Sequence, residues 1–161
     1  MIKKNNIKNP ITSIIVNRKA KHKYFIKETL EAGLVLLGWE VKAFKSGNIN
    51  ISNSYVAFYF NEVYLIGSQF NFLYTTNLHA LHHVSRNRKI LLHKNEITSL
   101  HSKIYKTGYT AIALSLFLKN SWCKIQIAIA KGKTKYDKRE TKKESQWKLE
   151  KNRILKNKLI F

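Results

Sequence analysis

Two alternating apolar segments between residues 110 and 130 place the strongest constraint on the fold of this chain. Every second residue is apolar: Ile112, Leu114, Leu116 and Leu118 in the first segment, and Cys123, Ile125, Ile127 and Ile129 in the second. Asn120–Ser121 lies between them and has the polar character of a tight turn. A period of two places one set of side chains on one face of a strand, so the pattern predicts an antiparallel β-hairpin.

Shorter segments predict the other elements. We expect strands at 12–16, 55–60, 63–67 (after a turn at Asn61–Glu62) and 89–92, and helices at 18–23, 39–45 and from about Ile97 to Gly108. The stretch 25–36 is compatible with a strand or a helix, and its period of two, with Gly33 inside it, favours a strand. Residues 1–10 are expected to form a loose arm, and residues 70–85 an irregular loop.

These elements indicate a mainly β protein. About seven antiparallel strands with short helices between them suggest a closed antiparallel OB-like β-barrel with flanking short helices, because closure removes exposed strand edges. We therefore assign residues 1–130 to the β-barrel domain and residues 131–161 to a basic C-terminal tail.

The tail differs sharply in composition from the rest of the chain. Residues 131–161 contain twelve basic and four acidic side chains and only widely spaced apolar ones. Such a segment cannot build its own core, so we expect it to be disordered until it is bound. It still has helical character, because one helical face collects Trp147, Lys151, Ile154, Leu155 and Lys158.

The charge balance indicates an anionic partner. Thirty Lys and Arg oppose nine Asp and Glu, for a net charge of +21, and Asp137 is the sole aspartate. Nucleic acid is the leading candidate because phosphate neutralisation releases condensed counterions, and a membrane surface is the second. Lysine greatly outnumbers arginine, so part of the excess can instead reflect an A/T-rich genome.

Several other classes of function find no support in the residues. There is no glycine-rich phosphate loop or nucleophile motif, and carboxylate pairs are scarce, so no enzyme and no cofactor are expected. His79, His82 and His83 lack the paired cysteines of a structural zinc site, so no metal is expected. A single cysteine and the lack of a long apolar run predict a soluble protein of a reducing compartment, the cytoplasm.

Three features are candidates for contact with nucleic acid. Trp147 lies in a charged tail with no core to enter, which favours an interface or a base stack. Lys131–Gly132–Lys133 places flexible backbone between two ammonium groups that can bind phosphate. Glu31 is a carboxylate within an apolar strand: it either pairs with a nearby lysine or accepts hydrogen bonds from RNA.

Motifs along nearly the whole chain resemble the SsrA-binding protein family (small protein B, SmpB) of bacterial trans-translation. The matching stretches are Asn17–Ile26, Glu31–Leu34, Gly38–Lys42, Asn50–Ser52, Ser54–Val56, Arg88–Lys89, Gly108–Thr110, Ala113–Leu116, Trp122–Lys124, Ala130–Lys133 and Asp137–Arg139. The resemblance implies a non-enzymatic adaptor that binds the tRNA-like domain of transfer-messenger RNA (tmRNA). It would deliver that RNA to stalled ribosomes for ribosome rescue and peptide tagging.

The resemblance also implies site residues and partners. The expected RNA-binding residues are Lys19, His22, Glu31, Lys42, Arg88, Lys89, Leu91, His93, Lys124, Lys131, Gly132 and Lys133. The expected ribosome-binding residues of the tail are Tyr136, Asp137, Lys138, Arg139, Trp147, Lys151, Arg153, Ile154, Leu155 and Lys156. Partners would be tmRNA, small-subunit ribosomal RNA and, through the charged RNA, elongation factor Tu, with one protein monomer per RNA and no membrane contact. A structural ribosomal protein with a basic extension is the alternative.

The chain departs from the family pattern at a few positions. His93 stands where the family usually has Asn; because His is a poorer helix cap, we expect the helix start to shift toward Asn95. Tyr136 replaces a frequent His, which keeps a stacking ring but loses the titrating imidazole, and Leu155 replaces a frequent Met. The loop 80–87 lacks the usual Asp-Pro character.

Overall fold

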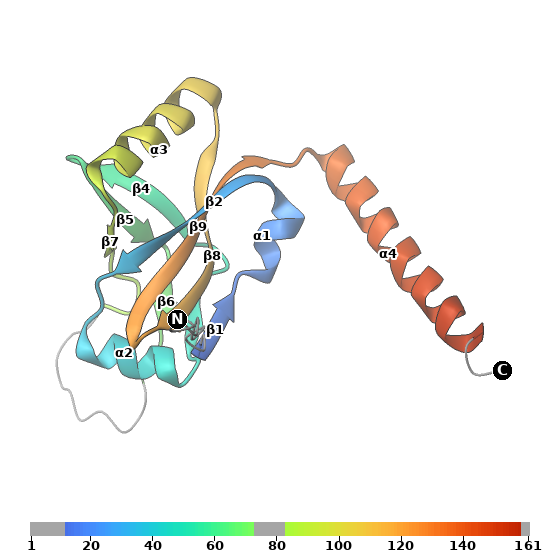
Figure 1. The fold of residues 1–161 in the computed structure, drawn as a ribbon, viewed down its shortest axis with the longest axis horizontal. Helices are drawn as coiled ribbons and strands as arrows, with labels where there is room; N and C mark the ends of the chain where they lie inside the picture. Colours follow the sequence, from blue (N-terminus) through green and yellow to red (C-terminus); the bar gives the residue numbers. More distant parts are fainter. Residues whose placement is uncertain (1–11, 73–82, 159–161) are drawn as a thin grey trace, which may run out of the picture.

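A ring of six antiparallel strands forms the centre of the molecule in the computed structural model, which describes residues 12–72 and 83–158. The ring runs through β8 (Thr110–Lys119), β4 (Tyr55–Tyr59), β5 (Glu62–Ile66), β7 (Arg88–Leu91), β2 (Tyr24–Leu34) and β9 (Trp122–Gly132), and the pairing of β9 with β8 closes it (Figure 1). One edge of β8 pairs with β9, while its other edge is shared between β4 and β1 (Thr12–Val16). Closure leaves few strand edges free for unwanted pairing.

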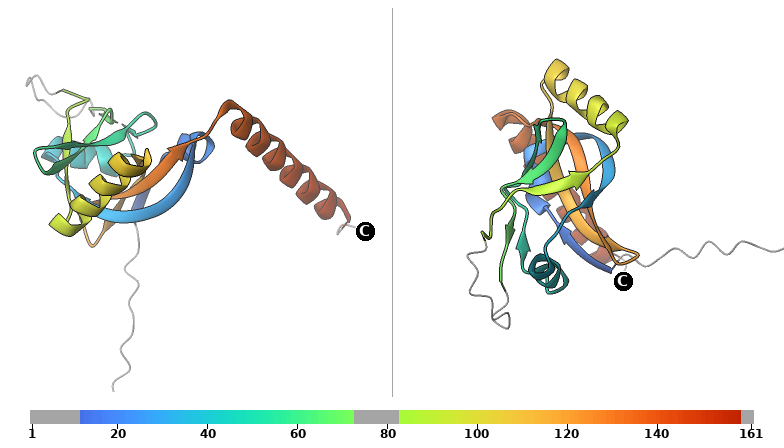
Figure 2. Two further views of the ribbon diagram at one scale, coloured as in Figure 1. Left: turned by 90° about the horizontal axis from the view of Figure 1, so that it is seen from above. Right: turned by 90° about the vertical axis from the view of Figure 1, so that its left-hand side faces the viewer.

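Four helices lie outside the ring in the described residues. Helix α1 (Arg18–Lys23) precedes β2, and α2 (Gly38–Lys45) lies at the end of the ring opposite α3 (Lys94–Thr107). Helix α4 (Lys135–Lys158) projects away from the strands, as Figure 1 and the left view of Figure 2 show. A separate two-stranded ladder joins β3 (Ile49–Asn50) to β6 (Gln69–Phe70). None of the helices in the described ranges is both long and apolar enough to cross a lipid bilayer.

The alternating side chains of the strands fill the ring. Val63, Leu65, Leu116, Ile125 and Ile127 are buried, and Trp39 and Phe44 of α2 pack against the same cluster. A second, smaller cluster lies under α1, where Ala20 contacts the outward-facing Ile112, Ala128 and Ala130. Small side chains on the outer face of β9 therefore let α1 approach the sheet closely.

Most of the predicted elements are confirmed. The hairpin at 110–130 is present, with left-handed φ values of 51° and 65° at Asn120 and Ser121, as a turn of type I′ requires. The ambiguous stretch 25–36 is a strand, as its period of two indicated. Helix α3 ends at Gly108, which has a φ of 65° and stops the helix in the left-handed conformation.

Three details differ from the prediction. The β4–β5 turn has its left-handed residues at Phe60 and Asn61, one position earlier than expected. The β3–β6 ladder was missed because two-residue strands show no alternation. Helix α3 begins at Lys94, not near Asn95, because Glu96 accepts a hydrogen bond from the backbone N–H of His93 (2.8 Å) and satisfies the helix start without an imidazole cap. Residues 1–10, most of the loop 70–85, His79 and His82 lie outside the described residues.

Candidate nucleic-acid interface

The outer face of strands β7, β2 and β9 brings several predicted RNA-binding residues together. Gly33 on β2 pairs with Leu91 on β7 and with Lys124 on β9, so these three positions form one row across the sheet. Glu31 lies two residues before Gly33 and therefore on the same face. We call Glu31, Gly33, Leu91 and Lys124 the outer patch.

The centre of the outer patch is apolar and hollow. A cavity of about 560 Å³ is lined by Gly33, Leu91, Trp122 and Lys124, together with residues of β2 and α2. Leu91 and Trp122 are more than half exposed, although both are large apolar side chains. A β-carbon at Gly33 would lie 3.2 Å from the β-carbon of Leu91, so glycine lets this leucine lie across β2.

Glu31 pairs with a lysine, as one of its two interpretations predicted, and its role toward RNA stays a prediction. Its Oε2 lies 3.3 Å from Nζ of Lys119, and both side chains are about half exposed. The carboxylate thus has a lysine partner, yet it remains accessible and lines a second hollow of about 530 Å³ beside α1. An exposed pair of this kind contributes about 0–1 kcal/mol to stability, so the fold does not depend on it.

Basic residues of α1 and of the end of β9, which are far apart in the sequence, lie near one another. Lys19 and His22 are exposed on this helix, and the helix is held in place by Asn17, whose side chain donates to the carbonyls of Ile51 and Ala113 and accepts from the N–H of Ala20. Strand β2 starts next to the end of β9, with Tyr24 opposite Gly132 and Phe25 opposite Lys131. The end of α1, with Lys19 and His22, is thus next to the end of β9, with Lys131 and Gly132, although Lys131 points to the face of β9 opposite to α1. We call these four residues the cationic region beside α1.

Lys133 connects this region to the tail. Its backbone N–H donates to the carbonyl of Lys23 (2.9 Å), and its Nζ donates to the carbonyl of Lys21 and to Thr141 Oγ1 (each 3.2 Å). The same ammonium lies 4.8 Å from the ring centre of Phe25. Lys133 is therefore half-buried and engaged within the protein, which makes it a connector between α1 and α4 as well as a cation.

The first turn of α4 has a reciprocal cap. Asp137 Oδ2 accepts hydrogen bonds from the N–H and the hydroxyl of Thr134 (2.9 and 2.8 Å), while Thr134 Oγ1 accepts from the N–H of Asp137 (3.2 Å). These hydrogen bonds lower the pKa of Asp137 below its ordinary value. Residues Thr134 to Asp137 have the spacing of a capping box, a signal that sequence reasoning missed.

The rest of the predicted tail site lies on α4. Tyr136, Arg139, Trp147, Lys151, Arg153, Ile154 and Leu155 are exposed, and Asp137 and Lys138 are half-buried. Trp147 is 68% exposed and Ile154 54% exposed, so the apolar groups of this helix have no core to fill. Hydrogen bonding to Glu140 raises the pKa of the Tyr136 hydroxyl. Lys156 belongs to the helix, but its side chain lies outside the described part of the chain.

The remaining predicted residues do not join one surface. Lys42 is exposed on α2, and His93 is exposed at the start of α3. Lys89 is half-buried and forms an ion pair with Glu62, which raises the pKa of the lysine and lowers that of the glutamate. Its positive charge is therefore already matched within the protein.

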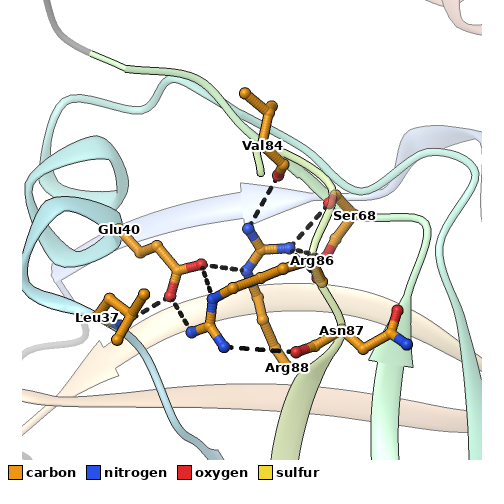
Figure 3. Close-up of polar contacts among 7 residues, drawn as sticks. All are labelled: Leu37, Glu40, Ser68, Val84, Arg86, Asn87 and Arg88. Carbon is orange, nitrogen blue, oxygen red and sulfur yellow. Dashed lines mark hydrogen bonds and ion pairs between the residues drawn. The ribbon is translucent and has the colours of Figure 1, made fainter. Parts of the chain in front are cut away.

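The assignment of Arg88 to the RNA surface is wrong. Its side chain is completely buried because it points inward with Ile90, on the face of β7 opposite to Lys89 and Leu91. The guanidinium donates to Glu40, to the carbonyl and hydroxyl of Ser68, and to the carbonyls of Arg86 and Val84 (Figure 3). Burial lowers the pKa of Arg88 to about 10, against the opposing effect of Glu40, so it stays charged near neutral pH.

Glu40 is the acceptor that organises this buried network. It is fully buried and accepts hydrogen bonds from Arg88 Nε (2.9 Å), from Arg86 Nε (2.8 Å) and Nη2, and from the N–H of Leu37 (2.7 Å) (Figure 3). The network joins α2 to the segment that enters β7, the strand that carries Leu91. We call Glu40, Arg86 and Arg88 the buried ion cluster.

No metal site is found in the parts that the structure describes, since no group of three or more His, Cys, Asp or Glu side chains there could hold an ion. Cys123 is half-buried against the core, and burial raises the pKa of its thiol. A protonated, shielded thiol of this kind is a poor nucleophile.

Comparison with known proteins identifies the family. The model of the SmpB protein family matches residues 14–157. The SsrA-binding protein of Buchnera aphidicola subsp. Baizongia pistaciae (strain Bp) is 53% identical over 155 residues, which cover 96% of this chain and 98% of that protein. A solved structure described as "tmRNA-SmpB: a journey to the center of the bacterial ribosome" contains a chain that is 32% identical, with a TM-score of 0.64, covering 80% of this chain and 94% of the other. The chain therefore belongs to the SmpB family of SsrA-binding proteins.

Proposed function

We propose that this protein is an RNA-binding adaptor without enzymatic activity. It binds the tRNA-like domain of tmRNA and delivers that RNA to stalled ribosomes for trans-translation, in which the ribosome is rescued and the unfinished peptide is tagged. The observation that carries the proposal is the family match over residues 14–157, which includes both the strands of the outer patch and nearly all of α4.

The surface chemistry supports a division of labour between two regions. The outer patch and the cationic region beside α1 contact tmRNA, through Glu31, Leu91 and Lys124 in the former and Lys19, His22 and Lys131 in the latter. The exposed face of α4 contacts small-subunit ribosomal RNA, because its charge attracts phosphates and its apolar groups have no internal partner. We propose that the free tail is disordered and acquires this helix on binding.

The finer assignments follow from the same proposal. The six-stranded ring is an OB-like barrel, a fold whose faces commonly bind oligonucleotides. The protein acts in the cytoplasm as a monomer on each RNA, and elongation factor Tu is an indirect partner that binds the charged RNA. It has no cofactor or membrane partner.

A comparison of Glu31→Ala with Lys119→Ala tests the outer patch. If the Glu31 carboxylate accepts hydrogen bonds from RNA, Glu31→Ala lowers the affinity for tmRNA in a gel-shift assay, and Lys119→Ala does not, because it leaves the carboxylate available. Both variants remove the same ion pair, so equal effects would show that the pair matters and the carboxylate does not. Unchanged affinity in Glu31→Ala would reject its role in RNA binding.

A truncation tests the role of the tail. Strand β9 continues to Gly132, and Lys133 bonds to Lys23, so the cut is placed after Thr134 to keep the ring intact. The truncated protein should bind tmRNA and fail to support peptide tagging on stalled ribosomes. Normal tagging would contradict the assignment of ribosome binding to α4, and stoichiometric presence of the full chain on every ribosome would favour a structural ribosomal protein instead.

A further inference from the structure

An apolar ring is held in an unfavourable position at the tip of the β4–β5 hairpin. Phe60 has a φ of 44°, in the left-handed region, and its side chain is completely exposed. Residues with a β-carbon rarely adopt this conformation, and Asn, Asp and Gly are preferred in such turns. The β8–β9 hairpin of the same chain follows that preference, with Asn120 at the corresponding position and a φ of 51°.

Neither feature of Phe60 benefits the folded protein. The backbone conformation costs free energy, and the exposed ring gains none from burial. Strained residues cluster at functional sites, so Phe60 is a candidate for a contact outside the molecule.

Other rings lie close to Phe60, on β4 and α3. The ring of His101 lies 5.6 Å from that of Phe58, edge to face, and 4.2 Å from that of Tyr105, with an interplanar angle of 31°. Tyr105 is 70% exposed. With Phe60 these side chains line a hollow of about 380 Å³, whose other lining residues are Asn61, Ile97 and Thr98. We call Phe58, Phe60, His101 and Tyr105 the aromatic surface.

The aromatic surface is separate from both regions of the proposed RNA interface. It is built from the β4–β5 hairpin and α3, whereas the outer patch lies on β7, β2 and β9 beside a hollow that reaches α2, and α4 projects from a different side (Figure 1). None of its residues is among those expected to bind tmRNA or the ribosome.

The chemistry of the aromatic surface matches an unpaired nucleobase. Exposed flat rings stack on bases, and stacking tolerates any base because each has a π-face. The polar side chains of Asn61 and Thr98 at the edge of the hollow can bond to the edge of a base. Helix α3 has three lysines and one glutamate, and Lys103 forms an ion pair with Glu28, so the attraction for a phosphate backbone comes mainly from the net charge of +21 of the whole chain.

We propose that the aromatic surface binds an unpaired RNA base, which stacks on the ring of Phe60, as a contact additional to the outer patch and α4. The inference rests on the proposed RNA-binding function. The base belongs either to tmRNA or to ribosomal RNA, and the two sources differ in which complex loses affinity when the ring is removed.

Phe60→Asn distinguishes the effect of the aromatic ring on RNA binding from any effect on the stability of the fold. Asn is favoured at a left-handed turn position, so this variant should melt at the same temperature as the unchanged protein or higher, while it removes the stacking surface. Phe60→Trp restores a ring. Tyr105→Gln removes a second ring from α3 without touching the turn, and serves as an independent variant.

The affinity of each variant is measured at one salt concentration for tmRNA alone, for protein-free ribosomal RNA and for ribosomes stalled on a truncated message. Loss of one base stack should weaken binding of Phe60→Asn by about 5- to 150-fold to one of the two RNAs, and Phe60→Trp should bind like the unchanged protein. If only the affinity for tmRNA falls, the base belongs to tmRNA. If the affinities for ribosomal RNA and for ribosomes fall, the base belongs to ribosomal RNA.

Two outcomes overturn the proposal. One is unchanged affinity of Phe60→Asn and Tyr105→Gln for all three targets. The other is a loss confined to complete ribosomes with both RNAs unaffected, which would identify a ribosomal protein as the occupant. The Glu31→Ala measurement on tmRNA reports on the proposed function separately, so failure of the aromatic surface alone leaves that function standing.

Discussion

Removal of the Glu40 carboxylate should destabilise the protein far more than removal of the Glu62 carboxylate. Both glutamates pair with basic side chains, but Glu40 and Arg88 are completely buried, whereas Glu62 and Lys89 are 40% and 42% exposed. Glu40→Ala leaves the Arg88 guanidinium charged in the interior without its carboxylate. Breaking a buried pair in this way costs about 3–5 kcal/mol, and breaking an exposed pair about 0–1 kcal/mol.

The difference can be measured by urea unfolding. The free energy of unfolding of a domain of this type is about 5–15 kcal/mol, so Glu40→Ala should lose a large part of it. With an m-value of about 2 kcal/mol per M, the midpoint should fall by about 2 M for Glu40→Ala and by less than about 0.5 M for Glu62→Ala. Tryptophan fluorescence reports the transition, because Trp39 is buried against the core, whereas Trp122 and Trp147 are already exposed in the folded protein.

A double variant tests the physical cause. If the cost arises from the unpaired guanidinium, Arg88→Met in the Glu40→Ala background should recover part of the lost stability, because it removes the buried charge. Equal midpoints for Glu40→Ala and Glu62→Ala, or no recovery in the double variant, would refute the reasoning that burial makes this cluster important.

Three further predictions concern the tail, the outer patch and the thiol. Asp137→Ala should weaken the first turn of α4 by removing its cap, seen as a smaller gain of helical circular dichroism when RNA is added. Because hydrogen bonds lower the pKa of Asp137, its contribution should persist at pH values above the ordinary 3.8 and disappear as the pH falls through the lowered pKa. Gly33→Ala should displace Leu91 and weaken tmRNA binding with little change in melting temperature, whereas unchanged binding would show that the close approach is unimportant. Cys123 should react with iodoacetamide more slowly in the folded protein than in urea, and equal rates would contradict the effect of burial.

The strand framework was predictable because burial in a sheet leaves a period of two in the sequence. Strand β9 shows it along its whole length, and in β2 it favours a strand over a helix. In β8 the prediction of a single apolar face is wrong, because a β-bulge between Ala113 and Ser115 places Ile112 and Leu114 on the outer face under α1, while Leu116 and Leu118 point into the core. The same reasoning could have placed Arg88 correctly, since it alternates with Lys89 and shares a face with Ile90. It was assigned to the surface because the family resemblance was followed there and its position in the strand was not considered.

The buried ion cluster could not be predicted from the sequence. Glu40 is separated from Arg86 and Arg88 by more than forty residues, and their contact depends on how α2 lies against the segment before β7. A pattern within a few neighbouring residues cannot indicate a contact between residues so far apart in the sequence. In contrast, the cap of α4 depends on four consecutive residues from Thr134 to Asp137, so its signal was present in the sequence and was overlooked.

Helix α4 is attached to the rest of the molecule through Lys133, so a small change of angle at Lys133 is amplified along the helix. Twenty-four residues of helix span about 36 Å, so a tilt of about 10° at Lys133 moves the distal end by about 6 Å. The same tilt would move Ile154 and Leu155, about twenty residues from the start of the helix, by about 5 Å. The direction of α4 therefore depends on the hydrogen bonds that Lys133 makes to Lys21 and Lys23.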